Sequence, residues 1–201
     1  MPIHTTFEPF EQSFLSRGFP RVCGVDEAGR GPLAGEVFAA AVILPAKVDL
    51  PGLNDSKLLT PKRRDKLFGM IQSQAVAWAV ASATLEEIEE LNILWAAMLA
   101  MRRAVEALTV PADFALVDGN RAPEFSIPCE AIVGGDGLCA SIAAASILAK
   151  VTRDREMEWL DRQYPGYGFA RNKGYGTAEH YEALERLGPC AAHRKGFRLG
   201  G

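Results

Sequence analysis

The chain has 201 residues, 48% of them apolar, and its 22 basic and 25 acidic side chains give a formal net charge of −3. This composition is typical of a globular domain with a real core and excludes a chain that is disordered throughout. The longest apolar stretches, 37–46 and 75–83, are about half the roughly 20 residues of a membrane-spanning helix. The first twenty residues lack the pattern of a secretory signal, so we expect no membrane association and a cytoplasmic location.

Three strands and two helices are predicted in the first half of the chain. β-branched residues mark the strands, and glycine and proline bound them. Proline at position 61 favours a helix start, and a capping box at Thr84–Glu87 precedes a segment whose apolar residues recur at helical spacing. In chain order the predicted elements are strands at 22–25 and 37–44, a helix at 62–71, a strand at 75–83 and a helix at 92–108.

Strands alternate with helices in the second half. Strands are predicted at 114–117 and 131–133, and a long helix rich in Ala and Ser over 138–159 must lie close to the sheet. A last helix begins after Thr177. This order predicts an α/β fold, with three antiparallel strands followed by strands alternating with helices, in a mixed sheet flanked by helices. We expect residues 1–163 to form the core, with a poorly defined segment at 1–20, and residues 164–201 to form a small helical and basic appendage packed on the same domain.

Two adjacent carboxylates, Asp26 and Glu27, directly follow the first apolar strand. Burying both is costly unless a cation neutralises them, and a hard divalent cation would do so. Neighbours on a regular strand point to opposite faces, so both can reach one ion only if the strand end twists or bulges. Gly29 and Gly31 would permit such a bend. The alternative is an acidic turn that faces solvent.

Two further aspartates, Asp118 and Asp136, stand where predicted strands end, and open α/β sheets usually bind ligands there. If the four carboxylates converge, they suit Mg²⁺ or Mn²⁺ rather than zinc, whose cysteine and histidine spacings are missing. Two such ions can hold a phosphodiester for hydrolysis by water. Taken singly, Asp118 is equally consistent with a turn and Asp136 with a helix N-cap. Asp154 on the long helix favours an ion pair but is a reserve candidate for the fourth acid.

Residues suited to nucleic acid follow in three loops. The Gly-Arg-Gly run at 29–31 lets backbone N–H groups approach a sugar-phosphate chain, Lys57 adds a cation, and Lys173 lies beside the glycine-flanked ring of Tyr175. The alternative for Tyr175 is a turn aromatic that covers the core. The remaining candidates are basic or histidine residues near the C-terminus: Arg186, Arg194, Lys195 and Arg198, which form an acid-free stretch favouring phosphate contact, and His180 and His193, which we expect to be exposed or capping.

The run Gly-Val-Asp-Glu-Ala-Gly-Arg-Gly-Pro-Leu-Ala-Gly at 24–35 closely resembles the opening motif of bacterial ribonuclease HII. Segments 53–57, 117–120, 141–151 and 173–177 resemble later motifs of that family in the same order, so the resemblance covers about residues 20–198. It implies a ribonuclease H-like fold and a Mg²⁺- or Mn²⁺-dependent hydrolase. Such an enzyme cleaves the RNA strand of RNA/DNA hybrids, and single ribonucleotides embedded in duplex DNA, leaving 3′-hydroxyl and 5′-phosphate ends.

The acidic site that the resemblance implies consists of Asp26, Glu27, Asp118 and Asp136. Residues 29–31 resemble the element that contacts the ribonucleotide 2′-OH and the junction phosphate, and Tyr175 resembles the tyrosine that stacks on the next deoxyribose. Asp136 lies in a loosely matching stretch, and Asp154 competes with it. The sequence departs from the family at Glu36, where proline is more common.

Two other functions are compatible with these residues. A metal-dependent DNA endonuclease such as a junction resolvase would share the carboxylates but need no 2′-OH. A non-catalytic module that binds hybrids is disfavoured, because acids beside a phosphate backbone repel it unless metal is present. Nothing in the sequence requires more than a monomer.

Overall fold

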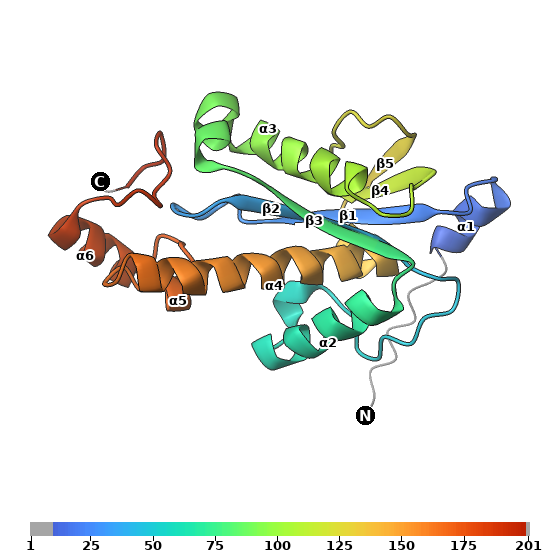
Figure 1. Ribbon diagram of the computed structural model, residues 1–201, viewed down its shortest axis with the longest axis horizontal. Coiled ribbons are helices and arrows are strands. Elements are labelled where there is room, and N and C mark those ends of the chain that lie inside the picture. Colours follow the sequence, from blue (N-terminus) through green and yellow to red (C-terminus); the bar gives the residue numbers. More distant parts are fainter. Residues whose placement is uncertain (1–9, 200–201) are drawn as a thin grey trace.

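The computed structural model describes residues 10–199, which form a mixed sheet with helices on both faces (Figure 1). The strand order is β3-β2-β1-β4-β5; β1 is antiparallel to β2 and parallel to β4, β2 and β3 are antiparallel, and β4 and β5 are parallel. The predicted fold class is therefore confirmed. The strands are β1 (Val22–Ala28), β2 (Val37–Ile43), β3 (Ala77–Ala83), β4 (Phe114–Asp118) and β5 (Cys129–Ile132).

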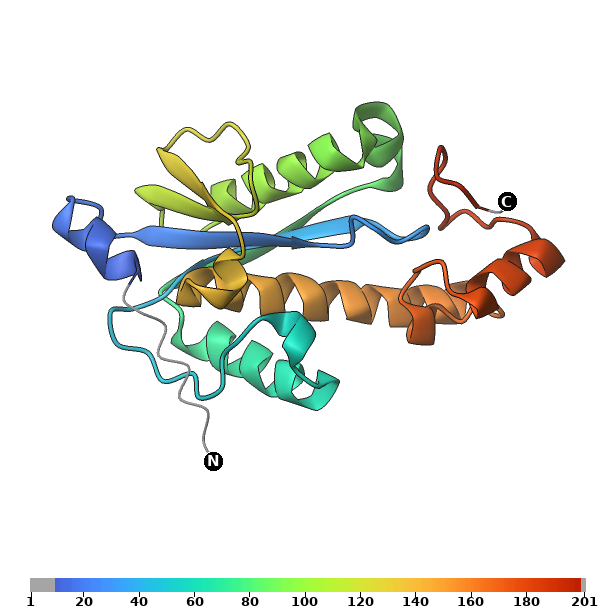
Figure 2. The same cartoon turned by 180° about the vertical axis from the view of Figure 1, so that it is seen from behind.

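Two long helices enclose the sheet. The helix α3 covers one face, and α4 covers the other, with α2 packed on its outer side (Figures 1 and 2). The described helices are α1 (Phe10–Ser16), the 3₁₀ turn η1 (Ser56–Leu58), α2 (Pro61–Gln74), α3 (Leu85–Glu106), the 3₁₀ turn η2 (Gly135–Gly137), α4 (Ala140–Gln163), α5 (Phe169–Asn172) and α6 (Ala178–Leu187).

The close approach of α4 to β1 depends on small residues. A Cβ atom at Gly24 in β1 would lie 2.2 Å from the backbone atoms Ser141 C and Ile142 N. The buried face of α4 carries Ala143, Ala144 and Ala145, each fully buried. The absence of a side chain at position 24 therefore lets the start of α4 lie directly on the sheet. This packing also brings η2, which precedes α4, to the ends of β1 and β4.

Several predicted boundaries differ from the structure. The strand predicted at 22–25 continues to Ala28, so Asp26 and Glu27 lie within β1 rather than after it. The capping box at Thr84 starts α3 directly, and Asn92, the predicted first residue of that helix, is instead a kink with φ 65°. The strand predicted at 131–133 occupies 129–132, and the one predicted from 75 begins at 77 because Ala75 caps α2. Within the poorly defined segment 1–20, residues 10–16 form α1, and residues 1–9 lie outside the described part.

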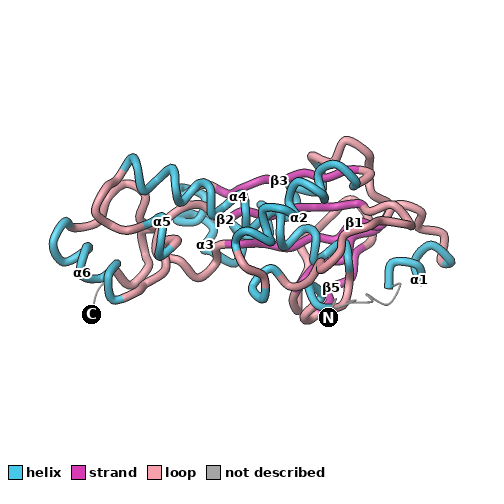
Figure 3. The backbone as a smooth tube through the Cα atoms, turned by 90° about the horizontal axis from the view of Figure 1, so that it is seen from below, coloured by secondary structure: helices cyan, strands magenta, loops and turns pink. Residues whose placement is uncertain are grey.

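The C-terminal residues pack at one end of α4, at the end of the molecule opposite α1 (Figure 3). Tyr167, Phe169 and Leu184 share a buried cluster with Met157 of α4 and with Leu33 from the loop after β1. This cluster ties the C-terminal segment to the Gly-Arg-Gly loop. Among residues 10–199, no helix combines the length and hydrophobicity needed to cross a bilayer.

Candidate active site

Three carboxylates come together where β1 and β4 end. One oxygen from each of Asp26, Asp118 and Asp136 lies within 4.8 Å of the others. The parallel register pairs Val25 with Val117, so the next residue of each strand stands beside its neighbour. The turn η2 adds the third acid, and the Asp136 N–H donates to Asp118 Oδ1 at 3.4 Å. The N-cap alternative for Asp136 is wrong, because this residue lies inside η2, before α4 begins.

Burial and mutual repulsion make this cluster costly without a cation. Burial, followed by the charges of Glu27 and Asp118, raises the pKa of Asp26 well above its ordinary value. Burial and the neighbouring Asp118 and Asp55 also raise the pKa of Asp136. Carboxylate oxygens are the donors that Mg²⁺ and Mn²⁺ prefer, so the donor set fits a hard divalent cation that would relieve the repulsion.

Glu27 lies beside the three aspartates but outside their group. The bend that would bring it in does not occur, because β1 keeps a continuous register with β2 through Ala28. Its Oε1 accepts a hydrogen bond from Arg30 Nη1 at 3.3 Å, while burial raises the pKa of its carboxyl, an effect that Arg30 opposes. Its role as a metal ligand stays a prediction.

A cleft of about 220 Å³ opens beside the acids. Asp26, Glu27 and Asp118 line it together with three predicted substrate-contacting elements, namely residues 29–31, Lys57 and Tyr175. A Cβ atom at Gly31 would lie 3.5 Å from Tyr175 Cε1, so the loop and the ring are direct neighbours. The ring is 47% exposed, which disfavours its interpretation as a core aromatic.

Two other predicted candidates lie outside this cleft. Lys173 lines a neighbouring pocket, and its Nζ donates to Glu158 Oε1 at 2.9 Å. Asp154 is held by Lys150, at 2.5 Å between Nζ and Oδ1, and by Arg64 at 3.7 Å. The ion-pair interpretation of Asp154 is thus confirmed, and Asp136 is the acid that joins Asp26 and Asp118.

The cleft also contains residues that the sequence analysis did not assign to the site. Ser146, Lys150 and Arg153 line it, together with Ser56, whose hydroxyl stands beside Lys57 in the segment 53–57. Ser146 Oγ lies 2.9 Å from Ser56 Oγ, so η1 and α4 meet beneath the acids. A four-residue spacing places Ser146 and Lys150 on one face of α4. Polar residues at this spacing in the otherwise apolar first half of α4 are the sequence feature that could have identified Ser146 and Lys150.

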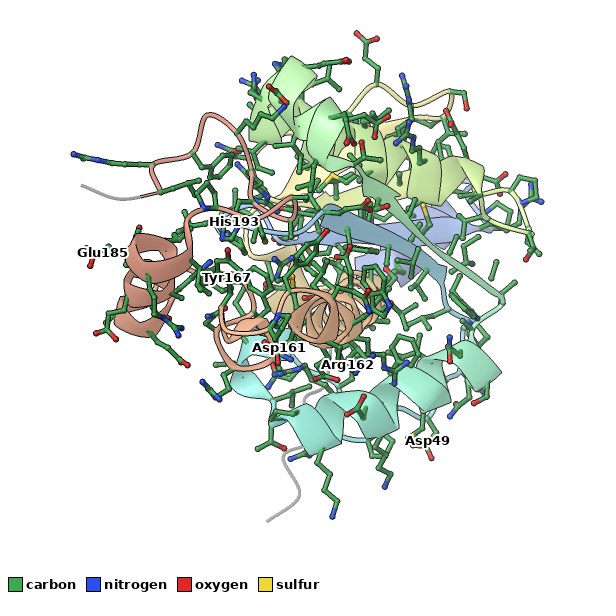
Figure 4. All side chains as sticks on the ribbon, turned by 60° about the vertical axis from the view of Figure 1, so that its left-hand side comes forward. Asp49, Asp161, Arg162, Tyr167, Glu185 and His193 are labelled. Carbon is green, nitrogen blue, oxygen red and sulfur yellow. The ribbon has the colours of Figure 1, made fainter. Side chains whose placement is uncertain are left out.

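One predicted basic residue and both C-terminal histidines are buried, although we expected them at the surface. Arg194 is 1% exposed, so it cannot contact a phosphate at the surface. His180 and His193 are buried rather than exposed or capping, because they pack against the rings of Tyr167 and Phe169. The ring centroids of Tyr167 and His193 lie 5.0 Å apart. Figure 4 shows the two residues on neighbouring segments at the C-terminal end of the molecule. The prediction of an exposed basic stretch is therefore wrong for Arg194.

Comparisons with known proteins agree on one family. The model of the family described as ribonuclease HII matches residues 23–199. A ribonuclease HII of Dechloromonas aromatica is 62% identical over 88% of this chain and 90% of its own length, and one of Shewanella amazonensis is 54% identical over 98% and 95%. The solved ribonuclease H2 of Pyrococcus horikoshii has a TM-score of 0.74 at 28% identity, covering 89% of this chain and 94% of that chain. The chain belongs to the ribonuclease HII family.

Proposed function

We propose that this protein is a divalent-metal-dependent endonuclease that cleaves the RNA strand of RNA/DNA hybrids and cuts at single ribonucleotides embedded in duplex DNA. Family membership supports the ribonuclease H activity. The observation that carries the metal dependence is the convergence of Asp26, Asp118 and Asp136 within 4.8 Å. The products would be 3′-hydroxyl and 5′-phosphate ends, and either Mg²⁺ or Mn²⁺ would serve.

The three aspartates, with Glu27 beside them, would hold the ions. When bound, such ions activate a water and stabilise the leaving oxygen of a phosphodiester. The scissile phosphate would then lie in the cleft that Asp26, Asp118 and the Gly-Arg-Gly loop line.

Cations at the rim would hold the nucleic acid backbone. The Lys57 side chain is 74% exposed, and its Nζ lies 3.4 Å from Asp136 Oδ2. Burial lowers its pKa, but the charges of Asp136, Asp55 and Asp26 outweigh this effect and leave the pKa raised. Lys57 therefore stays protonated at neutral pH and can pair with a phosphate near the acids. Arg30, with 49% of its side chain exposed, offers a second cation.

Recognition of the ribose would come from residues 29–31 and Tyr175. The 2′-OH is what distinguishes RNA from DNA at a given sugar, and backbone groups can read it only at close range. Gly29 and Gly31 leave the backbone unshielded, and the adjacent ring of Tyr175 offers a surface for stacking on the neighbouring sugar.

Three duplexes of one sequence test the proposal: all-DNA, DNA with one ribonucleotide, and an RNA/DNA hybrid. Each is incubated with the protein across a titration of Mg²⁺ and of Mn²⁺. We expect metal-dependent cleavage of the last two and none of the first. Equal cleavage of the all-DNA duplex would favour a resolvase-like DNA endonuclease, and binding without cleavage that is indifferent to chelator would favour a non-catalytic module.

The Asp118→Asn variant tests whether cleavage takes place at the acidic cluster. We expect it to lose cleavage by at least about a hundredfold, because a neutral amide cannot replace a charged ligand. Near wild-type activity in this variant would mean that the site lies elsewhere.

The cytoplasmic location and the monomeric state of the protein stay predictions. Cell fractionation would check the location, and sedimentation would check the oligomeric state.

A further inference from the structure

The buried guanidinium of Arg194 is surrounded by main-chain carbonyl groups of a single loop. Its Nε, Nη1 and Nη2 atoms donate to five carbonyl oxygens between Gly29 and Glu36. A guanidinium has five N–H groups, so all of them are used. The acceptors and distances are Gly29 at 2.6 Å, Arg30 at 3.2 Å, Pro32 at 2.8 Å, Gly35 at 2.8 Å and Glu36 at 3.2 Å.

This arrangement fixes the direction of the amide groups in the Gly-Arg-Gly loop. In a trans peptide the C=O of one residue and the N–H of the next point in opposite directions. Because the carbonyls of Gly29 and Arg30 face Arg194, the N–H groups of Arg30 and Gly31 point away from it. Leu33 shows the same effect, since the preceding carbonyl of Pro32 faces Arg194 and the Leu33 N–H donates outward to Gly174 O at 2.7 Å.

A second buried arginine and the chain around Arg194 hold the loop from other sides. Arg153 donates to the carbonyls of Ala34, at 3.1 Å, and Glu36, at 3.3 Å. The backbone N–H of Arg194 donates to Leu33 O at 2.9 Å, and Ala34 pairs with His193 in an isolated β-bridge. Burial and the neighbouring Arg153 lower the pKa of Arg194 to about 9, so the side chain still carries its charge and all five N–H groups at neutral pH.

We propose that Arg194 is a positioning residue for ribose recognition: it holds the loop 29–36 so that the N–H groups of Arg30 and Gly31 are presented to the cleft, where they contact the 2′-OH and the adjacent phosphate. This inference rests on the proposed function. Arg194 itself touches no substrate and acts from behind the loop. Lysine cannot replace it, because an ammonium group has three donors and no planar arrangement.

The Arg194→Lys variant tests this role in the metal-loaded enzyme. The measured quantities are KM and kcat on the one-ribonucleotide duplex and Ki for the all-DNA duplex of the same sequence as a competitor. We expect the ratio Ki/KM to fall about tenfold, the equivalent of a lost hydrogen bond to the 2′-OH, while Ki changes less than about twofold because the all-DNA duplex has no 2′-OH. A merely structural role would lower the active fraction, and hence kcat, and leave Ki/KM as in the wild type, which would overturn the proposal.

Arg102→Lys is the matched control. Arg102 lies on α3, half-exposed, in a surface pair with Glu106, so the same chemical change there should leave all three constants unaltered. Thermal unfolding of each protein reports whether the variants fold. If the wild type does not cleave or does not discriminate between the duplexes, the proposed function fails. If the wild type discriminates and the folded Arg194→Lys protein does so equally, only the positioning role fails.

A second measurement can overturn the proposal even if Arg194→Lys does not fold. In ¹⁵N-labelled Asp118→Asn protein, which should bind without cutting, we expect the amide resonances of Arg30 and Gly31 to shift more with the one-ribonucleotide duplex than with the all-DNA duplex. Equal shifts with both duplexes would show that these amides do not contact the 2′-OH and would overturn the proposal.

Discussion

The Nε2 atoms of His180 and His193 lie 3.0 Å apart in the interior of the protein. His180 Nδ1 is 2.9 Å from the carbonyl oxygen of Tyr175 and donates to it, so His180 Nε2 accepts a hydrogen bond from the Nε2–H of His193. His193 Nδ1 then accepts the N–H of Cys190 at 2.9 Å. In this arrangement each ring uses one nitrogen as a donor and the other as an acceptor. This chain of hydrogen bonds connects Cys190 in the C-terminal segment to the backbone of Tyr175 at the cleft.

The burial of His193 makes the stability of the protein depend on pH. Burial and His180 lower the pKa of His193 from 6.5 to about 4. Between these values the unfolded chain binds a proton that the folded protein does not, so the free energy of unfolding falls as the pH drops from 6.5 to 4 and is fully recovered above 6.5. The expected loss is up to about 3 kcal/mol.

Denaturant unfolding at several pH values checks this, with His193→Gln as the comparison. The glutamine variant should be less stable at pH 7 and should lose part of the slope between pH 4 and 6.5. An identical slope in both proteins would mean that His193 does not titrate in this way.

Gly24→Ala should be strongly destabilising. The added methyl group would lie 2.2 Å from the backbone of α4, so the helix must move away from β1. We expect a loss of at least about 1–3 kcal/mol, as for overpacking, and a loss of cleavage because η2 and Asp136 move with α4. The control is Gly69→Ala in α2, where nothing lies within 4 Å and alanine should stabilise the helix by about 0.5–1 kcal/mol. Equal melting temperatures for the two variants would contradict the close packing at Gly24.

The Asp26→Asn substitution should raise the stability of the metal-free protein and abolish its activity. Burial, Glu27 and Asp118 raise the pKa of Asp26 well above its ordinary value, so the charged form is unfavourable in the metal-free protein. The neutral amide should raise the melting temperature in chelator by roughly 2–4 °C, the equivalent of about 1 kcal/mol in a chain of this size, while it abolishes cleavage. Thermal scans with and without Mn²⁺ measure both effects. A lower melting temperature in chelator would show that the crowded carboxylates do not destabilise the fold.

The variants Asp136→Asn and Asp154→Asn distinguish the two candidates for the fourth acid of the site. Asp136 lies with Asp26 and Asp118, whereas Asp154 pairs with Lys150 and Arg64. We expect kcat/KM to drop by at least about a hundredfold in Asp136→Asn. In Asp154→Asn we expect a drop of only a few-fold, because the lost group is a partly buried ion-pair partner and not a metal ligand. The reverse order would transfer the ligand role to Asp154.

Much of the acidic site follows from local patterns. Asp26 and Asp118 directly follow the apolar residues of their strands, and the parallel pairing of β1 with β4 then places them side by side. The boundary near Asn92 was not predictable, because the apolar spacing is continuous across the kink. The role of Arg194 was also hidden, since its acceptors lie 158–165 residues away in the sequence and a basic stretch normally faces solvent. The division of the chain at residue 164 stays a prediction.

Calorimetric titration of Mn²⁺ into the metal-free protein tests the three-aspartate site most directly. The wild type should bind the ion with a measurable heat, and Asp118→Asn should lose at least about tenfold in affinity while its far-UV circular dichroism is unchanged. Wild-type affinity and stoichiometry in the folded Asp118→Asn protein would contradict a metal site built from Asp26, Asp118 and Asp136.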